Sequence, residues 1–127
     1  MIPIAYLIDT WAWIEYFDNS RTDIADIING DELVFTSIIS LTEIITLFAR
    51  KKSVQDGHVA VSKVLRLSHI VPITTDIAIH AGLYKKKEFP GGTADRLIYA
   101  TAELNGLTIL TGDEDFRHIP GVHYLGK

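Results

Sequence analysis

The segment that most constrains the fold is residues 4–10, where an unbroken apolar stretch leads directly to Asp9 and Thr10. A short apolar run of this kind is typical of a strand that is buried on both faces of a parallel sheet. Ligands bind beyond the carboxyl ends of the central strands in open α/β sheets, so Asp9 is a candidate site residue by its position. Asp9 and Thr10 are also good N-cap residues, and capping of the next helix explains Asp9 at least as well when it is taken alone.

A second buried strand is predicted at residues 107–111, and it is also followed by a carboxylate, at Asp113. Further short apolar segments have the composition of strands; they are residues 33–35, 69–73 and 122–125. Helical patterns separate these strands, at residues 10–17, 23–29, 37–52, 54–68, 75–87 and 93–105. Alternating strands and helices predict an α/β fold with a mainly parallel sheet and right-handed crossovers.

Three local signals refine these boundaries. Pro72 marks the strand at residues 69–73 as an edge strand, because proline cannot donate to a central ladder. The helix at residues 75–87 is expected to be capped by Thr75 or Asp76. The helix at residues 93–105 is the clearest in the sequence, with Thr93 as its predicted N-cap and Gly106 as its stop.

The length of the chain predicts one domain over residues 1–127, and a content of 47% hydrophobic and 22% charged residues argues against disorder. The absence of cysteine excludes disulfide frameworks, thiolate zinc sites and cysteine nucleophiles, and it fits a reducing cytosol. No apolar run approaches the roughly 18 residues needed to span a bilayer, and no basic region precedes the first apolar segment. We therefore expect a cytoplasmic protein that does not contact a membrane.

Glu43 lies within a predicted helix whose apolar stripe includes Ile38, Leu41 and Ile44. Its neighbours one helical turn away are apolar, and a carboxylate in such surroundings needs a partner, since an unpaired buried charge is costly. Ser40 and Glu43 also match a capping box, in which Glu43 would only satisfy backbone donors. That alternative fails if the helix begins before Ser40.

Asp95 lies in the first turn of its predicted helix, where the helix dipole favours an anion for purely structural reasons. In a parallel sheet, however, the ends of the strands before Asp9 and Asp113 lie at one edge, and the helices that carry Glu43 and Asp95 begin or pass near it. Converging carboxylates would repel one another and raise each other's pKa values unless a cation neutralised them. Hard oxygen ligands of this kind suit Mg²⁺ or Mn²⁺, and two such ions about 4 Å apart can support water attack on a phosphodiester.

Four segments in order resemble the acidic motifs of the PIN domain family, and the short length resembles the VapC-type toxins within it. The segments are Leu7-Ile-Asp9-Thr10, Ser37-x5-Glu43, Ala94-Asp95-Arg-Leu-Ile98-Tyr-Ala-Thr-Ala102 and Thr111-Gly-Asp113-Glu-Asp115-Phe116. The resemblance spans nearly the whole chain. It implies a three-layer α/β/α sandwich around a central five-stranded parallel sheet.

The resemblance also implies an activity and a set of site residues. The implied activity is Mg²⁺- or Mn²⁺-dependent endoribonuclease action by the toxin of a type II toxin-antitoxin pair, with a cognate antitoxin and a second copy of the chain as partners. The implied metal-binding and catalytic acids are Asp9, Glu43, Asp95 and Asp113. Auxiliary roles fall to Asp115, to Thr111 as an orienting hydroxyl, and to Thr10.

An RNA substrate requires positive charge around this negative centre, because phosphate contacts supply most sequence-independent affinity. The formal net charge is −4, but 11 acidic residues stand against 12 basic ones when five acids are set aside: Asp9, Glu43, Asp95, Asp113 and Asp115. Candidate substrate-binding residues are Lys85, Lys86, Lys87 and Arg96, which lie close to Asp95 in the chain. The lysines equally suit a solvated helix end. Trp11, Trp13 and Tyr16 can stack on bases, although such aromatics more often fill a core.

Three other functions remain open at this stage. One is RNA processing by a PIN-like nuclease outside a toxin-antitoxin pair. Another is an aspartyl phosphotransferase, which the sequence disfavours because Trp11 occupies the place of the second acid. The last is a non-catalytic interaction module whose acids serve only as helix caps, and such a module would gain no stability from added metal.

Overall fold

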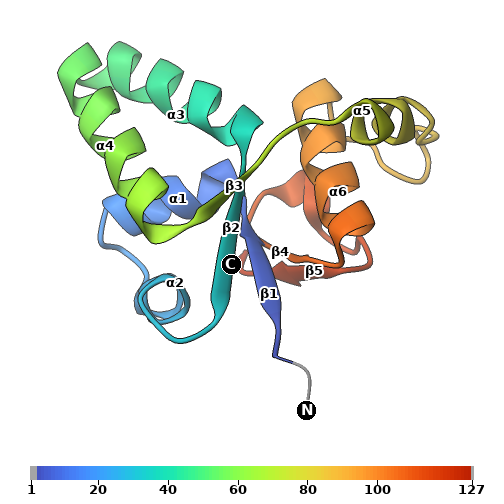
Figure 1. Ribbon diagram of the computed structural model, residues 1–127, viewed down its shortest axis with the longest axis horizontal. Coiled ribbons are helices and arrows are strands. Elements are labelled where there is room, and N and C mark those ends of the chain that lie inside the picture. The colour runs from blue at the N-terminus through green and yellow to red at the C-terminus, as the bar shows by residue number, and fades with distance from the viewer. Residues whose placement is uncertain (1–2, 127) are drawn as a thin grey trace.

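The computed structural model describes residues 3–126 and contains a five-stranded parallel sheet in the order β3-β2-β1-β4-β5 (Figure 1). The strands are β1 (Ala5–Ile8), β2 (Leu33–Ser37), β3 (His69–Val71), β4 (Thr108–Thr111) and β5 (Val122–Tyr124). The chain leaves β1 toward β2 on one side, and β4 pairs with β1 on the other side. The strand order therefore reverses between β1 and β4. In open α/β sheets, ligands bind beyond the carboxyl ends of the strands at this point.

Helices cover both faces of the sheet. The first four, α1 (Thr10–Phe17), α2 (Thr22–Ile28), α3 (Ile38–Lys51) and α4 (Val54–Leu67), lie on one side, and α5 (Thr75–Gly82) and α6 (Thr93–Asn105) lie on the other (Figure 1). This is the expected three-layer α/β/α sandwich, and the predicted fold class is confirmed. Among residues 3–126, none of the helices has the length and apolar character that a membrane span requires.

The two cores follow from the alternation of side chains along β1. Tyr6 and Ile8 pack in one buried cluster with residues of α1 to α4, whereas Leu7 packs in a second cluster with Ile98 of α6 and with Phe116. Leu7 and Ile8 are fully buried, as expected for a central strand covered on both faces. This packing fixes the rotation of β1 and, with it, the direction in which Asp9 leaves the sheet.

The strand register brings the ends of β1 and β4 to the same level. Ile8 pairs with Leu110, and the Asp9 amide donates to the Leu110 carbonyl at 3.1 Å. Asp9 and Thr111 therefore emerge side by side at the sheet edge. A one-residue slip in register would move every β4 side chain to the opposite face, so the apolar pattern of β4 also fixes this pairing.

The predicted C-terminal end of the helix at residues 75–87 was wrong. It ends at Gly82, and the chain turns back so that Phe89 is fully buried in the cluster that contains Phe116. Its N-cap was also wrong: Thr74, not Thr75 or Asp76, accepts the capping bond from the Ile77 amide at 3.2 Å. Burial of Phe89 outweighs the local helix propensity of the segment that precedes it.

The predicted start of the last helix needs a smaller correction. Gly92 occupies the N-cap position and Thr93 is the first helical residue. The predicted stop is confirmed, because Gly106 has the left-handed backbone conformation, with φ of 65°, that commonly ends a helix. Pro72 directly follows β3, which is an edge strand as expected. A short 3-10 helix, η1 (Glu114–Phe116), was not predicted.

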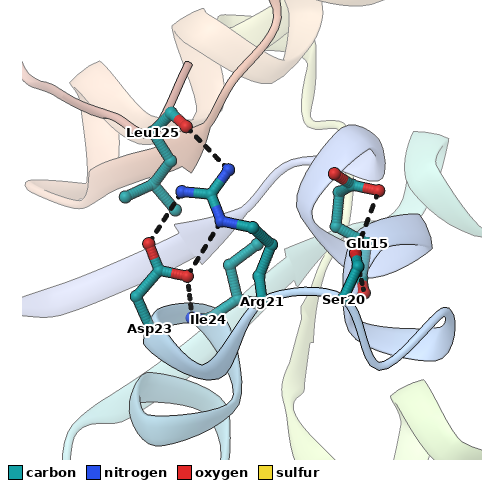
Figure 2. A network of polar contacts seen from close by, with 6 residues as sticks. All are labelled: Glu15, Ser20, Arg21, Asp23, Ile24 and Leu125. Carbon is teal, nitrogen blue, oxygen red and sulfur yellow. Dashed lines mark hydrogen bonds and ion pairs between the residues drawn. The ribbon is translucent and has the colours of Figure 1, made fainter. Parts of the chain in front are cut away.

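A polar network joins Leu125, in the segment after β5, to the start of α2 (Figure 2). The Arg21 guanidinium donates to both carboxylate oxygens of Asp23, at 3.1 and 2.7 Å, and to the Leu125 carbonyl at 2.9 Å. The same guanidinium lies 5.8 Å from the centre of the Trp11 ring. The network therefore links the segment after β5 to the helical layer that carries α1.

Candidate metal centre

Asp9 is fixed by a hydroxyl of the neighbouring strand. Its Oδ2 accepts a hydrogen bond from Thr111 Oγ1 at 2.7 Å, and only 3% of Asp9 is exposed. Asp9 occupies the N-cap position of α1, yet among the described residues its side chain receives no capping bond. Capping therefore does not account for the buried carboxylate, which needs another reason to be there.

Thr111 connects Asp9 to Asp113. The Thr111 oxygen accepts the Asp113 amide at 3.0 Å, which orients its proton toward Asp9. One Asp113 oxygen in turn accepts the Asp115 amide at 3.0 Å and caps η1. The bend after β4 thus places Asp113 near Asp9, the residue that follows β1.

Asp95, Asp113 and Asp115 form a tight group. One carboxylate oxygen of each lies within 4.8 Å of the others. Asp95 lies in the first turn of α6, and α6 is on the opposite face of the sheet from α1. Oxygens on one Mg²⁺ lie at most about 4.2 Å apart, since each is about 2.1 Å from the ion, so small side-chain rotations suffice for binding.

The pKa values of Asp9 and Asp95 show that the charged forms of these two acids are disfavoured. The pKa of Asp9 is raised to about 7, chiefly by burial and also by the charges of Asp95 and Asp113, against the opposing effect of the Thr111 bond. Burial also raises the pKa of Asp95 to about 6, assisted by the charges of Asp113, Asp115 and Glu43. A divalent cation would remove this repulsion, and the purely oxygen donor set fits Mg²⁺ or Mn²⁺.

Glu43 reaches the same region from α3. The capping-box alternative fails, because α3 begins at Ile38 and its N-cap is Ser37. Glu43 Oε1 instead accepts the Thr10 hydroxyl at 2.6 Å, and its charge contributes to the raised pKa of Asp95. It lies outside the group of three aspartates, as does Asp9. The site therefore has two acids bonded to threonines and three acids facing one another.

The candidate substrate-binding residues are placed differently. Arg96 is half-buried, and its guanidinium donates to the Ala81 carbonyl at the end of α5, at 3.3 Å. Lys85, Lys86 and Lys87 are exposed in the segment between α5 and α6. Their contact with a substrate stays a prediction.

The two tryptophans have separate positions. Trp13 is fully buried and its indole donates to Thr36 at 3.0 Å, as a core residue does. Trp11 is half-buried and covers Gly112, where an added Cβ would lie 2.5 Å from the ring. Glycine at this position allows the ring to approach the backbone between Thr111 and Asp113.

Sequence reasoning missed one residue of the site. Ser40 is fully buried, and its Oγ lies 2.9 Å from Thr10 Oγ1. Ser40 precedes Glu43 by one helical turn, so both side chains lie on one face of α3. That spacing was available in the sequence, where it matched a capping motif instead.

The comparisons with known proteins agree with this geometry. The PIN domain family profile matches residues 6–122, and the chain belongs to this family. The comparison with curated proteins gave no match.

Solved structures from toxin-antitoxin systems have the same fold. The structure of VapBC2 from Rickettsia felis, bound to a promoter DNA fragment, is 16% identical with a TM-score of 0.77, covering 97% of this chain and 98% of that chain. A toxin-antitoxin complex from Klebsiella pneumoniae is 27% identical with a TM-score of 0.72, covering 93% and 95%. The VapC20 toxin of Mycobacterium tuberculosis, described as cleaving the sarcin-ricin loop, is 20% identical with a TM-score of 0.71, covering 88% and 92%. The resemblance of the sequence to PIN domains is thereby confirmed.

Proposed function

We propose that this protein is a metal-dependent endoribonuclease and the toxin of a type II toxin-antitoxin pair, acting in the cytoplasm as one domain over residues 1–127. The observation that carries the proposal is the convergence of acids from four separate segments at the strand-order reversal, with three carboxylates within 4.8 Å of one another. Membership of the PIN family and the VapC-type neighbours support it.

In this proposal Asp9, Glu43, Asp95 and Asp113 hold Mg²⁺ or Mn²⁺, and Asp115 assists at the exposed rim. When bound, the ion lowers the pKa of a water and stabilises charge on the phosphodiester oxygens. The protein supplies fixed geometry: Thr111 orients Asp9, and the turn into η1 orients Asp113. The burial of Asp9 keeps bulk water from its carboxylate, which strengthens its attraction for a cation.

The proposed substrate is RNA. Exposed Lys85, Lys86 and Lys87 supply positive charge on the segment that leads into α6, the helix that carries Asp95. Phosphate contacts of this kind add affinity without base specificity. Arg96 is the fourth candidate, and it would first have to leave the Ala81 carbonyl.

The proposed partners are a cognate antitoxin and a second copy of the chain. The structural neighbours from Rickettsia felis and Klebsiella pneumoniae are toxin-antitoxin complexes. In this chain a groove between α1 and α3 is lined by apolar residues that include Ile14 and Phe48, and also by Asp18, Lys51 and Lys52. Such a groove fits an amphipathic segment that carries acidic residues.

Cleavage of mixed RNA by purified protein tests the nuclease proposal. We expect cleavage with Mg²⁺ or Mn²⁺, none with EDTA, and cleavage by the Asp9→Asn variant with metal that is slower by roughly a hundredfold or more. Undiminished cleavage in EDTA, or by Asp9→Asn, would contradict the assigned chemistry. A small open reading frame directly upstream would favour a toxin over a processing nuclease.

A further inference from the structure

The Glu43 carboxylate accepts a hydrogen bond from Thr10, which is not one of the candidate metal-binding acids. Thr10 follows Asp9 directly and begins α1, whereas Glu43 lies in the second turn of α3. The Thr10 hydroxyl donates to Glu43 Oε1 at 2.6 Å, a short bond of the kind that a carboxylate acceptor forms. Thr10 is only 8% exposed, so water competes little for its hydroxyl.

Ser40 completes this arrangement. Its Oγ lies 2.9 Å from Thr10 Oγ1 and is fully buried. Ser40 and Glu43 therefore offer Thr10 two acceptors from one face of α3. The single Thr10 proton bonds more strongly to a carboxylate than to a neutral hydroxyl. Loss of Glu43 would still leave the Thr10 hydroxyl a partner, which avoids the cost of an unsatisfied buried donor.

We infer that Thr10 is a positioning residue for Glu43, and that Ser40 fixes Thr10 in the rotamer that this requires. The inference rests on the proposed metal-dependent function. Glutamate loses much side-chain rotamer entropy when it is fixed, and the Thr10 bond fixes Glu43 before any ion arrives. The bond occupies Oε1 and leaves Oε2 for a cation. Thr10 thus orients the acid on α3 in the way that Thr111 orients Asp9, the acid that follows β1.

The test measures Mn²⁺ binding to metal-free protein by calorimetry at pH 8, without a substrate. Thr10→Val keeps the shape of the side chain and removes the hydroxyl, and we expect Mn²⁺ affinity to fall roughly 10- to 100-fold, as for other residues that orient metal ligands. Thr10→Ser restores the hydroxyl and should restore most of the affinity. Ser40→Ala should cause a smaller loss, because the bond from Thr10 to Glu43 remains.

Thr101→Val is the matched control. Thr101 is also a fully buried threonine, on α6, and its hydroxyl donates to the Leu97 carbonyl of the same helix at 2.7 Å. The Mn²⁺ affinity of the Thr101→Val variant should equal that of the unchanged protein. Equal losses in Thr101→Val and Thr10→Val would mean that any buried hydroxyl matters, and would overturn the inference.

A double-mutant cycle with Glu43→Gln shows whether Thr10 acts through Glu43. If it does, Thr10→Val causes little further loss of Mn²⁺ affinity in the Glu43→Gln background; fully additive losses would overturn the inference. Circular dichroism and thermal melting verify that each variant is folded, and Ser40→Ala with its own Glu43→Gln cycle decides the question if Thr10→Val does not fold. An unchanged protein that binds no Mn²⁺ contradicts the proposed function itself. If the unchanged protein binds Mn²⁺ and folded Thr10→Val binds it equally tightly, the inference is overturned but the proposed function is not.

Discussion

Two parts of the candidate metal centre hold their acids in different ways; we name them the buried side, after buried Asp9, and the open side, after exposed Asp115. On the buried side, Asp9 and Glu43 each accept a short hydrogen bond from a threonine. On the open side, Asp95, Asp113 and Asp115 face one another across less than 4.8 Å. Burial is the largest cause of the raised pKa of both Asp9 and Asp95, and the charges of neighbouring acids contribute to both.

This difference teaches how a fold can prepare a cation site without the cation. On the buried side each carboxylate has a hydroxyl partner, whereas the open side includes the exposed Asp115. The two sides meet at Gly112, which Trp11 covers. Removal of an acid from one side should therefore have consequences that removal from the other side does not.

The largest expected contrast is in RNA cleavage. Asp9→Asn removes the charge of the buried acid, and we expect the rate to fall roughly a hundredfold or more, because both a metal ligand and its preset geometry are lost. Asp115→Asn removes an exposed acid, and we expect a loss of about tenfold. Single-turnover cleavage of one RNA by both variants gives the comparison. Equal losses would show that the buried and open sides contribute alike.

The second contrast is the pH dependence of Mn²⁺ affinity. Acids must lose their protons to bind a metal, so affinity should fall as the pH drops below the pKa of about 7 for Asp9 and about 6 for Asp95. Between pH 8 and pH 6 we expect a loss of roughly tenfold or more, measured by calorimetry. In Asp9→Asn the remaining dependence should move toward lower pH. An affinity that is constant over this range would contradict the raised pKa values.

The third contrast is the stability of metal-free protein. The folded-state pKa of Asp9 lies above the ordinary value of 3.8, so the folded state binds more protons and stability should decrease as the pH rises from about 4 to about 7. Asp9→Asn removes the buried charge and should raise the melting temperature at pH 8 in EDTA by about 5 °C. At pH 4 the two proteins should melt alike. A lower melting temperature for Asp9→Asn at pH 8 would contradict a burial cost at Asp9.

The smallest contrast concerns the junction of the two sides. Gly112→Ala places a Cβ 2.5 Å from the Trp11 ring, and we expect a loss of about 1–3 kcal/mol of stability as the ring shifts. Gly82→Ala is the control, because an added Cβ there meets nothing within 4 Å. Urea unfolding measures both variants. Equal stability of Gly112→Ala and the unchanged protein would show that the ring moves freely.

The sequence was sufficient for the fold because its signals were strong where the packing is tightest. The apolar runs of β1 and β4 predicted central strands, and both are deeply buried. The signals failed where a distant contact decides the local structure. Burial of Phe89 ends α5 earlier than helix propensity predicted, and that contact joins residues that are far apart in the chain.

The site was predictable to a similar extent. Its acids could be grouped because parallel strands end at one edge, and the motifs of the family mark them. The hydrogen bond from Thr10 to Glu43 joins residues 33 positions apart, and no periodic pattern encodes such a contact. Ser40 was overlooked because its spacing from Glu43 also fits a capping box. Side-chain partners within a site thus required the structure.

The central claim is that separate carboxylates converge because a divalent cation neutralises them. A crystal structure of the protein soaked in Mn²⁺, with the anomalous signal of the ion recorded, tests it most directly. The account predicts Mn²⁺ bound by Asp9, Glu43, Asp95 and Asp113, with the Thr10 and Thr111 hydroxyls still bonded to their acids. An ion-free site at saturating Mn²⁺, or Mn²⁺ bound only elsewhere on the surface, would contradict it.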